Sequence, residues 1–95
     1  MNEPEISSRE MKELFAAIAV LKTEAECKKF FRDLCTLSEL KAMAERWQVA
    51  KKVQKGISYR EISKITGAST ATITRVAHWL HHGMGGYKLM LERLI

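Results

Sequence analysis

The stretch that decides the fold is YREISKITGASTATITRVAH, residues 59–78. It places one glycine, Gly67, between two short segments whose apolar residues repeat at helical spacing. Small and hydroxyl-bearing side chains follow Gly67, which is unusual for a helix that serves packing alone. A short helix, a tight turn with glycine and a second helix form the helix-turn-helix pattern, which we predict at about residues 58–82.

The apolar residues of this stretch predict a core shared by its two helices. Gly67 is expected to adopt positive φ in the turn, and Ser63 is small enough for the two helices to approach closely. The residues expected to supply this core are Ile62, Ala68, Ile73 and Val76.

The second helix is predicted to present one face to DNA. Successive side chains of a helix are rotated by about 100°. When the apolar residues point to the core, the residues between them therefore point outward. Short side chains at the start of such a helix allow close approach to base edges, and Arg75 is its one long base-reading candidate. Arg60 and Lys64 are predicted to hold phosphates. The predicted contacts on the second helix are Ser69, Thr70, Ala71, Thr74, Arg75 and His78.

Charge supports a nucleic-acid partner. The net charge is +5, and residues 41–82 carry eight basic and two acidic side chains, against six basic and eight acidic in residues 1–40. A solvated basic helix face would produce the same bias, but here it coincides with the helix-turn-helix pattern. We therefore expect Lys51, Lys52 and Lys55 to add phosphate contacts.

Four capping motifs predict where helices begin. A Ser or Thr followed three residues later by Glu can satisfy the free N–H groups of a helix start. The pairs are Ser7/Glu10, Thr23/Glu26, Thr36/Glu39 and Ser58/Glu61. The predicted helix ends are Gly56 and, for the second helix of the helix-turn-helix, a position near Gly83. A last helix is predicted over residues 88–95. Together these signals predict an all-α chain of about six helices and no strand.

Size and composition predict a single domain, residues 1–95, that gains burial by oligomerisation. No apolar run approaches a membrane span, and the first residues lack the parts of a signal peptide, so we expect a cytoplasmic protein without a membrane partner. Cys27 and Cys35 lack metal or disulfide spacing and are expected to be buried free thiols.

These motifs resemble those of the Trp repressor family. The resemblance rests on ATITR at residues 71–75, the TxxE motif that starts at Thr36, the basic helix with Arg46 and the helix end at Gly56. The tail GMGGYKLMLERL resembles an uncharacterised bacterial branch of the same family. The resemblance implies a homodimer with interlaced N-terminal helices, at about residues 7–35. It also implies a sequence-specific double-stranded DNA-binding regulator of transcription, acting as a repressor. The family's DNA contacts correspond to Arg60, Thr70, Ala71 and Thr74.

The resemblance also implies an effector site. Thr36, Arg46 and Arg75 match the threonine and two arginines of the family's L-tryptophan pocket. The family has a glycine and a serine where this chain has Val76 and Trp79. These larger side chains are expected to occupy the space an indole would need, so we predict no L-tryptophan cofactor and leave another small effector open.

Other function classes have weaker support in the sequence. His78, His81 and His82 have the i, i+3, i+4 spacing of metal ligands, but no Cys or carboxylate lies nearby to complete a shell, so we predict no metal site. No phosphate-binding glycine loop or nucleophile motif indicates an enzyme. The alternative that stays open is a helix-turn-helix used for protein interaction or assembly without DNA binding.

Overall fold

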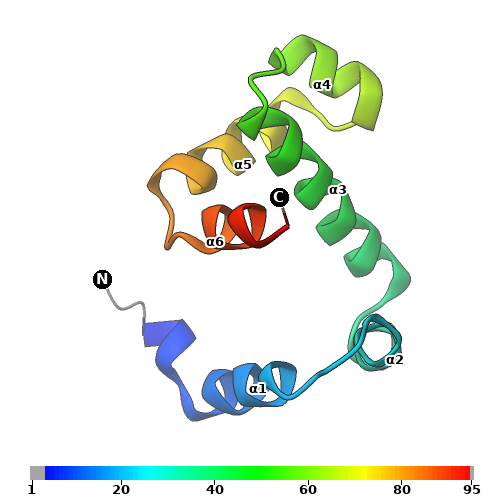
Figure 1. Cartoon of the computed structure of the whole chain (residues 1–95), viewed down its shortest axis with the longest axis vertical. Helices are drawn as coiled ribbons and strands as arrows, with labels where there is room; N and C mark the ends of the chain where they lie inside the picture. The colour runs from blue at the N-terminus through cyan, green and yellow to red at the C-terminus, as the bar shows by residue number, and fades with distance from the viewer. Residues whose placement is uncertain (1–3, 95) are drawn as a thin grey trace. The chain divides into compact units, whose positions relative to one another are not determined.

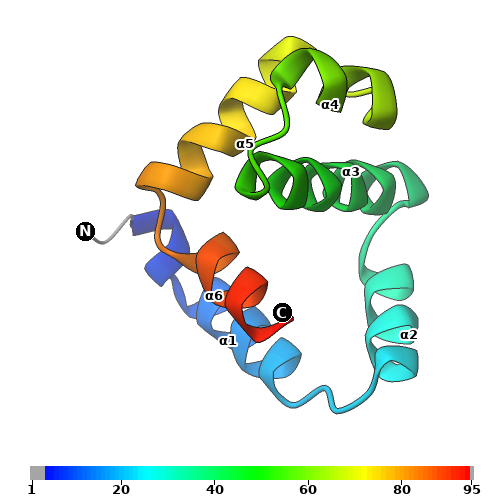
Figure 2. The same cartoon turned by 45° about the horizontal axis from the view of Figure 1, so that its top comes forward.

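The computed structural model describes residues 4–94, which form helices joined by short turns (Figures 1 and 2). Within these residues no strand is present, so the all-α prediction is confirmed. No helix in this part of the chain is long and apolar enough to cross a membrane. The elements are η1 (Pro4–Ser7), α1 (Arg9–Ala19), α2 (Glu24–Leu34), α3 (Leu37–Gln54), α4 (Tyr59–Thr66), α5 (Thr70–His82) and α6 (Gly86–Arg93).

Backbone contacts divide the chain into two compact units. The N-terminal unit ends at Leu37, and the C-terminal unit begins at Ser38. The single domain expected from the length stays a prediction.

The helix starts of the N-terminal unit follow its capping residues. The α1 prediction was wrong by one residue: Ser8 is extended and its Oγ accepts a 3.2 Å hydrogen bond from the Met11 N–H, whereas Ser7 lies in η1. Thr23 is the predicted cap of α2, and its hydroxyl accepts from the Glu26 N–H at 3.1 Å. The Glu26 carboxylate accepts in turn from the Lys22 N–H at 2.9 Å. The short turn between α1 and α2 is thereby fixed.

The N-terminal unit buries none of its helical side chains. Neither α1 nor α2 contains a buried residue, and Phe15 and Leu34 are each 49% exposed. The expectation of buried thiols was wrong for this single chain, since Cys27 is exposed and Cys35 is half-buried, although both are free. The amphipathic faces of these helices are left without a core of their own.

The C-terminal unit is built around a closed core. The second half of α3 packs against α4 and α5 in both views (Figures 1 and 2). The core predicted from the helix-turn-helix pattern is confirmed, and α3 adds two residues to it. The buried cluster consists of Val49, Ala50, Ile62, Ala68, Ile73 and Val76.

Local signals set the ends of these helices. Ser58 caps α4 by accepting from the Glu61 N–H at 3.2 Å. Gly67 ends α4 with φ +78°, where a side chain would be strained, and a Cβ there would meet no atom within 4 Å. The requirement for glycine is therefore conformational rather than steric. Ser69 caps α5, and Gly83 ends it as predicted.

The last helix begins earlier than predicted. It covers Gly86–Arg93 instead of residues 88–95, because Gly85 takes φ +87° and serves as its N-cap. Ile95 lies outside the described residues. Gly86 and Tyr87 thus belong to α6, which brings the Tyr87 ring onto Trp47 of α3 with centroids 6.3 Å apart.

Candidate nucleic-acid interface and adjoining pocket

The turn of the helix-turn-helix is held by side-chain hydrogen bonds. The Ser63 hydroxyl donates to the Ala68 carbonyl at 2.8 Å. The Thr66 hydroxyl donates to the Ile62 carbonyl at 2.7 Å and accepts from the Ala68 N–H at 3.1 Å. The pattern predicted only the small size of Ser63, and it missed that both hydroxyls satisfy backbone groups as the chain reverses. These bonds fix the angle at which α5 leaves the turn.

The exposed face of α5 is the one the helical period predicted. Its inward residues Ile73, Val76, Ala77 and Leu80 are buried. The structure places each predicted DNA contact at the surface: Arg60, Lys64, Ser69, Thr70, Ala71, Thr74, Arg75 and His78 are all exposed. These side chains come from α4, from the turn and from one side of α5.

Ser69 has a structural role that limits its role in contact. Its Oγ accepts from the Thr72 N–H at 3.1 Å and donates to the Thr72 Oγ1, also at 3.1 Å. The hydroxyl of Ser69 is therefore used by the helix cap, whereas no such role is seen for Thr70 or Thr74 in this part of the chain.

The electrostatics of this surface suit a polyanion. No acidic residue occurs on α5, and its N-terminal N–H groups carry the positive end of the helix dipole. Lys64 lies in the last turn of α4, while Lys51 and Lys52 lie half-buried in the last turn of α3. Cationic side chains thus occur on α3 and α4 as well as on α5, where Arg75 is exposed.

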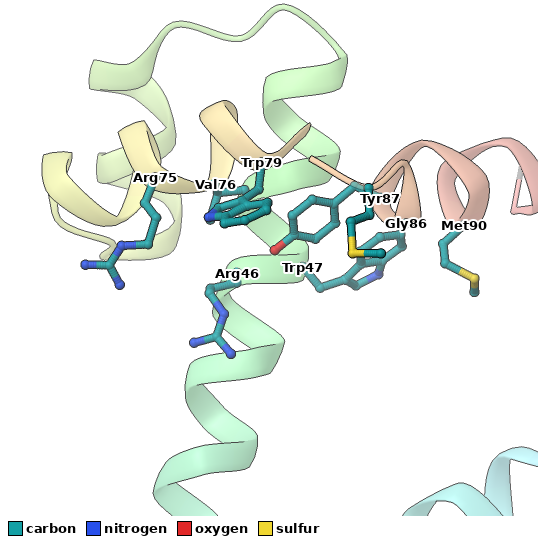
Figure 3. A pocket seen from close by; sticks show the side chains of 9 residues that line it. Arg46, Trp47, Arg75, Val76, Trp79, Gly86, Tyr87 and Met90 are labelled. Carbon is teal, nitrogen blue, oxygen red and sulfur yellow. The ribbon is translucent and has the colours of Figure 1, made fainter. Parts of the chain in front are cut away.

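A pocket of about 700 Å³ lies beside the buried side of α5 (Figure 3). The two arginines and the wall residues identified in the sequence meet here. In Figure 3 the guanidinium groups of Arg46 and Arg75 lie on one side of it, and the rings of Trp47 and Tyr87 lie on the other. The lining residues are Arg46, Trp47, Arg75, Val76, Trp79, Met84, Gly86, Tyr87 and Met90.

Trp79 forms a wall of this pocket and does not fill it. Its side chain is 46% exposed, while Val76 beneath it is 1% exposed. A Cβ at Gly83 would collide with the Trp79 carbonyl oxygen and with Cε3 of the indole, so glycine permits the chain to pass close to this ring. Val76 and Trp79 narrow the pocket but leave open space beside the Trp79 ring. That the pocket excludes L-tryptophan stays a prediction.

The sequence identified only part of the pocket. Thr36 belongs to the N-terminal unit and is not among the lining residues, so the structure brings together only Arg46 and Arg75 of the predicted effector set. Met84, which precedes α6, and the α6 residues Tyr87 and Met90 were missed, although the aromatic and Met-rich tail after Gly83 was a signal for them.

The helix-turn-helix with its exposed, basic face and this adjoining pocket match a known family. The family model described as "Trp repressor protein" matches residues 9–95. The chain belongs to the Trp repressor protein family. The family is one of transcription regulators and not of enzymes, and its helical fold is a DNA-binding one with a helix-turn-helix.

Relatives of known sequence or structure cover nearly the whole chain. It is 40% identical over 94 residues to "Uncharacterized protein YerC" of Bacillus subtilis (strain 168), covering 99% of this chain and 90% of that protein. A TrpR-like protein from Eubacterium eligens ATCC 27750 superposes with TM-score 0.92 at 39% identity, over 97% of this chain and 95% of that one. A proposed Trp repressor from Staphylococcus aureus superposes with TM-score 0.91 at 40% identity, over 99% and 94%. The Trp repressor resemblance is thus confirmed.

Proposed function

We propose that the chain is a sequence-specific double-stranded DNA-binding regulator that acts as a homodimeric repressor of transcription. The observation that carries the proposal is the exposed face of α5, which presents Thr70, Ala71, Thr74 and Arg75 in front of a closed helix-turn-helix core. A rigid core behind a helix with small exposed residues is what deep insertion into a major groove requires. Because such a regulator acts where the chromosome is, its place is the cytoplasm.

Side-chain length and charge separate the residues of this surface into base contacts and phosphate contacts. Thr70 and Thr74 offer hydroxyls and methyl groups for base edges, and Arg75 offers a bidentate donor for guanine. Arg60 and Lys64 reach outward from α4 and hold phosphates, which fixes register without sequence information. We assign the exposed His78, farther along α5, to contact with the backbone of the duplex.

The homodimer is supported by the unburied faces of α1 and α2. Two helices with apolar stripes and no buried residue need a partner surface, and a second copy offers the same stripes in return. A two-fold dimer would also place two copies of α5 on successive major grooves, so palindromic sites are expected.

Selection from a random duplex pool tests this proposal. We expect recovered sites to share two inverted half-sites about one helical turn apart. Affinity for the selected duplex should fall steeply as salt increases, because phosphate contacts release counterions. Recovery of no enriched motif, with no retention of any duplex at low salt, would contradict the proposal.

The alternative function is an assembly module without DNA binding. It has one supporting observation, the exposed apolar side chains of α4, where Tyr59 is 43% and Ile65 is 55% exposed. Such a module would show no salt-dependent retention of DNA, and Ile65→Asp would abolish its partner complex. The same substitution should leave DNA affinity nearly unchanged if α5 carries the function.

We also propose that the pocket beside α5 takes a small effector other than L-tryptophan, held by Arg46 and Arg75. The apolar wall with two guanidinium groups suits a small ligand that carries a negative charge. Thermal denaturation in the presence of candidate metabolites tests it, since a ligand of the folded state raises the melting temperature. If L-tryptophan alone among the metabolites raised the melting temperature, the proposal would be contradicted.

A further inference from the structure

The C-terminal half of α5 carries a pair of histidines, of which His78 is among the proposed DNA contacts and His82 is not. His78 and His82 are one helical turn apart, and both are exposed. Their ring centroids lie 5.3 Å apart, with the ring planes tilted by 44°. His81 also lies in this turn, but its ring is 6.4 Å from that of His82 and nearly perpendicular to it, at 67°.

The separation of the His78 and His82 ring centroids is compatible with chelation of one ion by both rings. Two imidazoles bound to a tetrahedral Zn²⁺ at about 2.1 Å have ring centres about 5.2 Å apart. In place of the sequence-based expectation that these histidines bind no metal, we propose that His78 and His82 together bind a divalent transition-metal cation of the Zn²⁺ class. The i, i+4 spacing supplies both nitrogen ligands from one rigid helix, so little ordering is needed when the ion binds.

The surroundings select the kind of cation. No Asp or Glu occurs on α5, so Mg²⁺ and Ca²⁺ would find no carboxylate oxygen there. Imidazole nitrogens suit Zn²⁺, Cu²⁺ and Ni²⁺. Arg75 lies about one turn before His78, and its positive charge repels a cation. Affinity for the metal ion therefore comes from coordination by the imidazole nitrogens and not from electrostatic attraction.

The site leaves coordination positions open. Among residues 4–94 no group of three or more His, Cys, Asp and Glu side chains is placed to hold a metal. Two imidazoles therefore leave two tetrahedral positions for water or for an oxygen of a bound molecule. Since the pair lies along α5 beyond Arg75, and if the proposed function holds, a phosphate oxygen of DNA can take one of them.

Calorimetric titration of the full chain with ZnCl₂, without DNA, tests the site. We expect one Zn²⁺ site per chain that His78→Ala and His82→Ala each weaken at least tenfold. His81→Ala is the matched control and should change the affinity less than twofold. Any binding by the free thiols Cys27 and Cys35 persists in all three variants, so the difference among them isolates the histidine pair. MgCl₂ should give no heat at this site.

Two results would overturn the assignment. One is Zn²⁺ affinity that His78→Ala and His82→Ala leave unchanged. The other is an equal loss in His81→Ala, which would indicate diffuse binding by the whole helix end. DNA titrations with and without Zn²⁺ form a separate arm, in which we expect at least threefold tighter binding with the ion in the unaltered chain only. Zn²⁺ binding with no DNA binding under any condition would keep the metal site and refute the proposed function.

Discussion

The two compact units of this chain differ in how much they bury. In the C-terminal unit Val49, Ile62 and Ile73 are 0% exposed, whereas α1 and α2 of the N-terminal unit bury nothing. Full burial of one such side chain contributes about 1.5–3 kcal/mol. The C-terminal unit therefore has a core of its own behind α5, whereas α1 and α2 have none. Under the proposed function, DNA recognition and dimerisation would fall on different parts of the chain.

The largest expected effect is on the closed core. Ile62→Ala should lower the free energy of unfolding by about 2–5 kcal/mol, because it leaves a cavity among α3, α4 and α5. Ile65→Ala is the matched control on the same helix, since Ile65 is 55% exposed, and it should cost far less. Urea denaturation of both variants measures the difference. Equal losses would mean that α4 is covered on both sides, which would remove the contrast between the units.

Dimerisation gives the next largest effect. Phe15→Asp places a charge on the apolar stripe of α1 and should weaken the dimer at least a hundredfold, about 2.8 kcal/mol. Ala16→Asp adds the same charge to an exposed position off that stripe and should leave the dimer intact. Sedimentation equilibrium over a range of concentrations measures both. A folded monomer of the unaltered chain at micromolar concentration would contradict the need of the N-terminal unit for a partner.

A substitution on the exposed face of α5 is expected to remove a single base contact. Thr74→Ala should cost about 1–3 kcal/mol on the selected site with little change on nonspecific DNA. Arg60→Ala is the counterpart and should weaken all duplexes alike, while the salt slope decreases by about one unit. Fluorescence anisotropy at several salt concentrations separates the two. If Arg60→Ala lowered DNA affinity only through one base position of the operator, this side chain would read sequence.

The pocket tests whether the C-terminal unit is complete without a ligand. Because Val76 is buried and Trp79 walls the pocket, α5 is expected to be held in place, and specific DNA binding should need no tryptophan. Val76→Gly combined with Trp79→Ser should loosen α5 and lower operator affinity at least tenfold, about 1.4 kcal/mol. Titrations with and without millimolar L-tryptophan measure this. Binding by the unaltered chain only in the presence of tryptophan would refute it.

The smallest effect is expected at the turn. Gly67→Ala should cost about 1 kcal/mol, because alanine is disfavoured at φ +78° although no atom obstructs its Cβ. Gly86→Ala, at a helical position with nothing within 4 Å, is the control and should not destabilise the protein. Thermal denaturation compares them. A loss at Gly67 of several kcal/mol would indicate that the turn also packs against another surface.

Sequence patterns predicted the helices of both units but not all of their ends. The caps at Thr23 and Ser58 were predicted because their hydrogen bonds link residues three apart in the chain. The starts of α1 and α6 were misplaced because two adjacent serines, and two adjacent glycines, offer alternatives that the pattern does not distinguish. Ile62 and Ile65 were both taken as apolar positions of one helix, yet only Ile62 is in the core.

The sequence by itself determined the all-α class, the helix-turn-helix, the outward face of α5 and the Trp repressor family, because each depends on local spacing or on a contiguous motif. Only the tertiary structure decided what residues distant in the chain form together. Trp47 and Tyr87 meet across α3 and α6 to wall a pocket. Side-chain distances were likewise decided only in three dimensions: the i, i+4 spacing of His78 and His82 permitted a metal site, but the 5.3 Å between their rings depends on rotamers that the spacing does not specify.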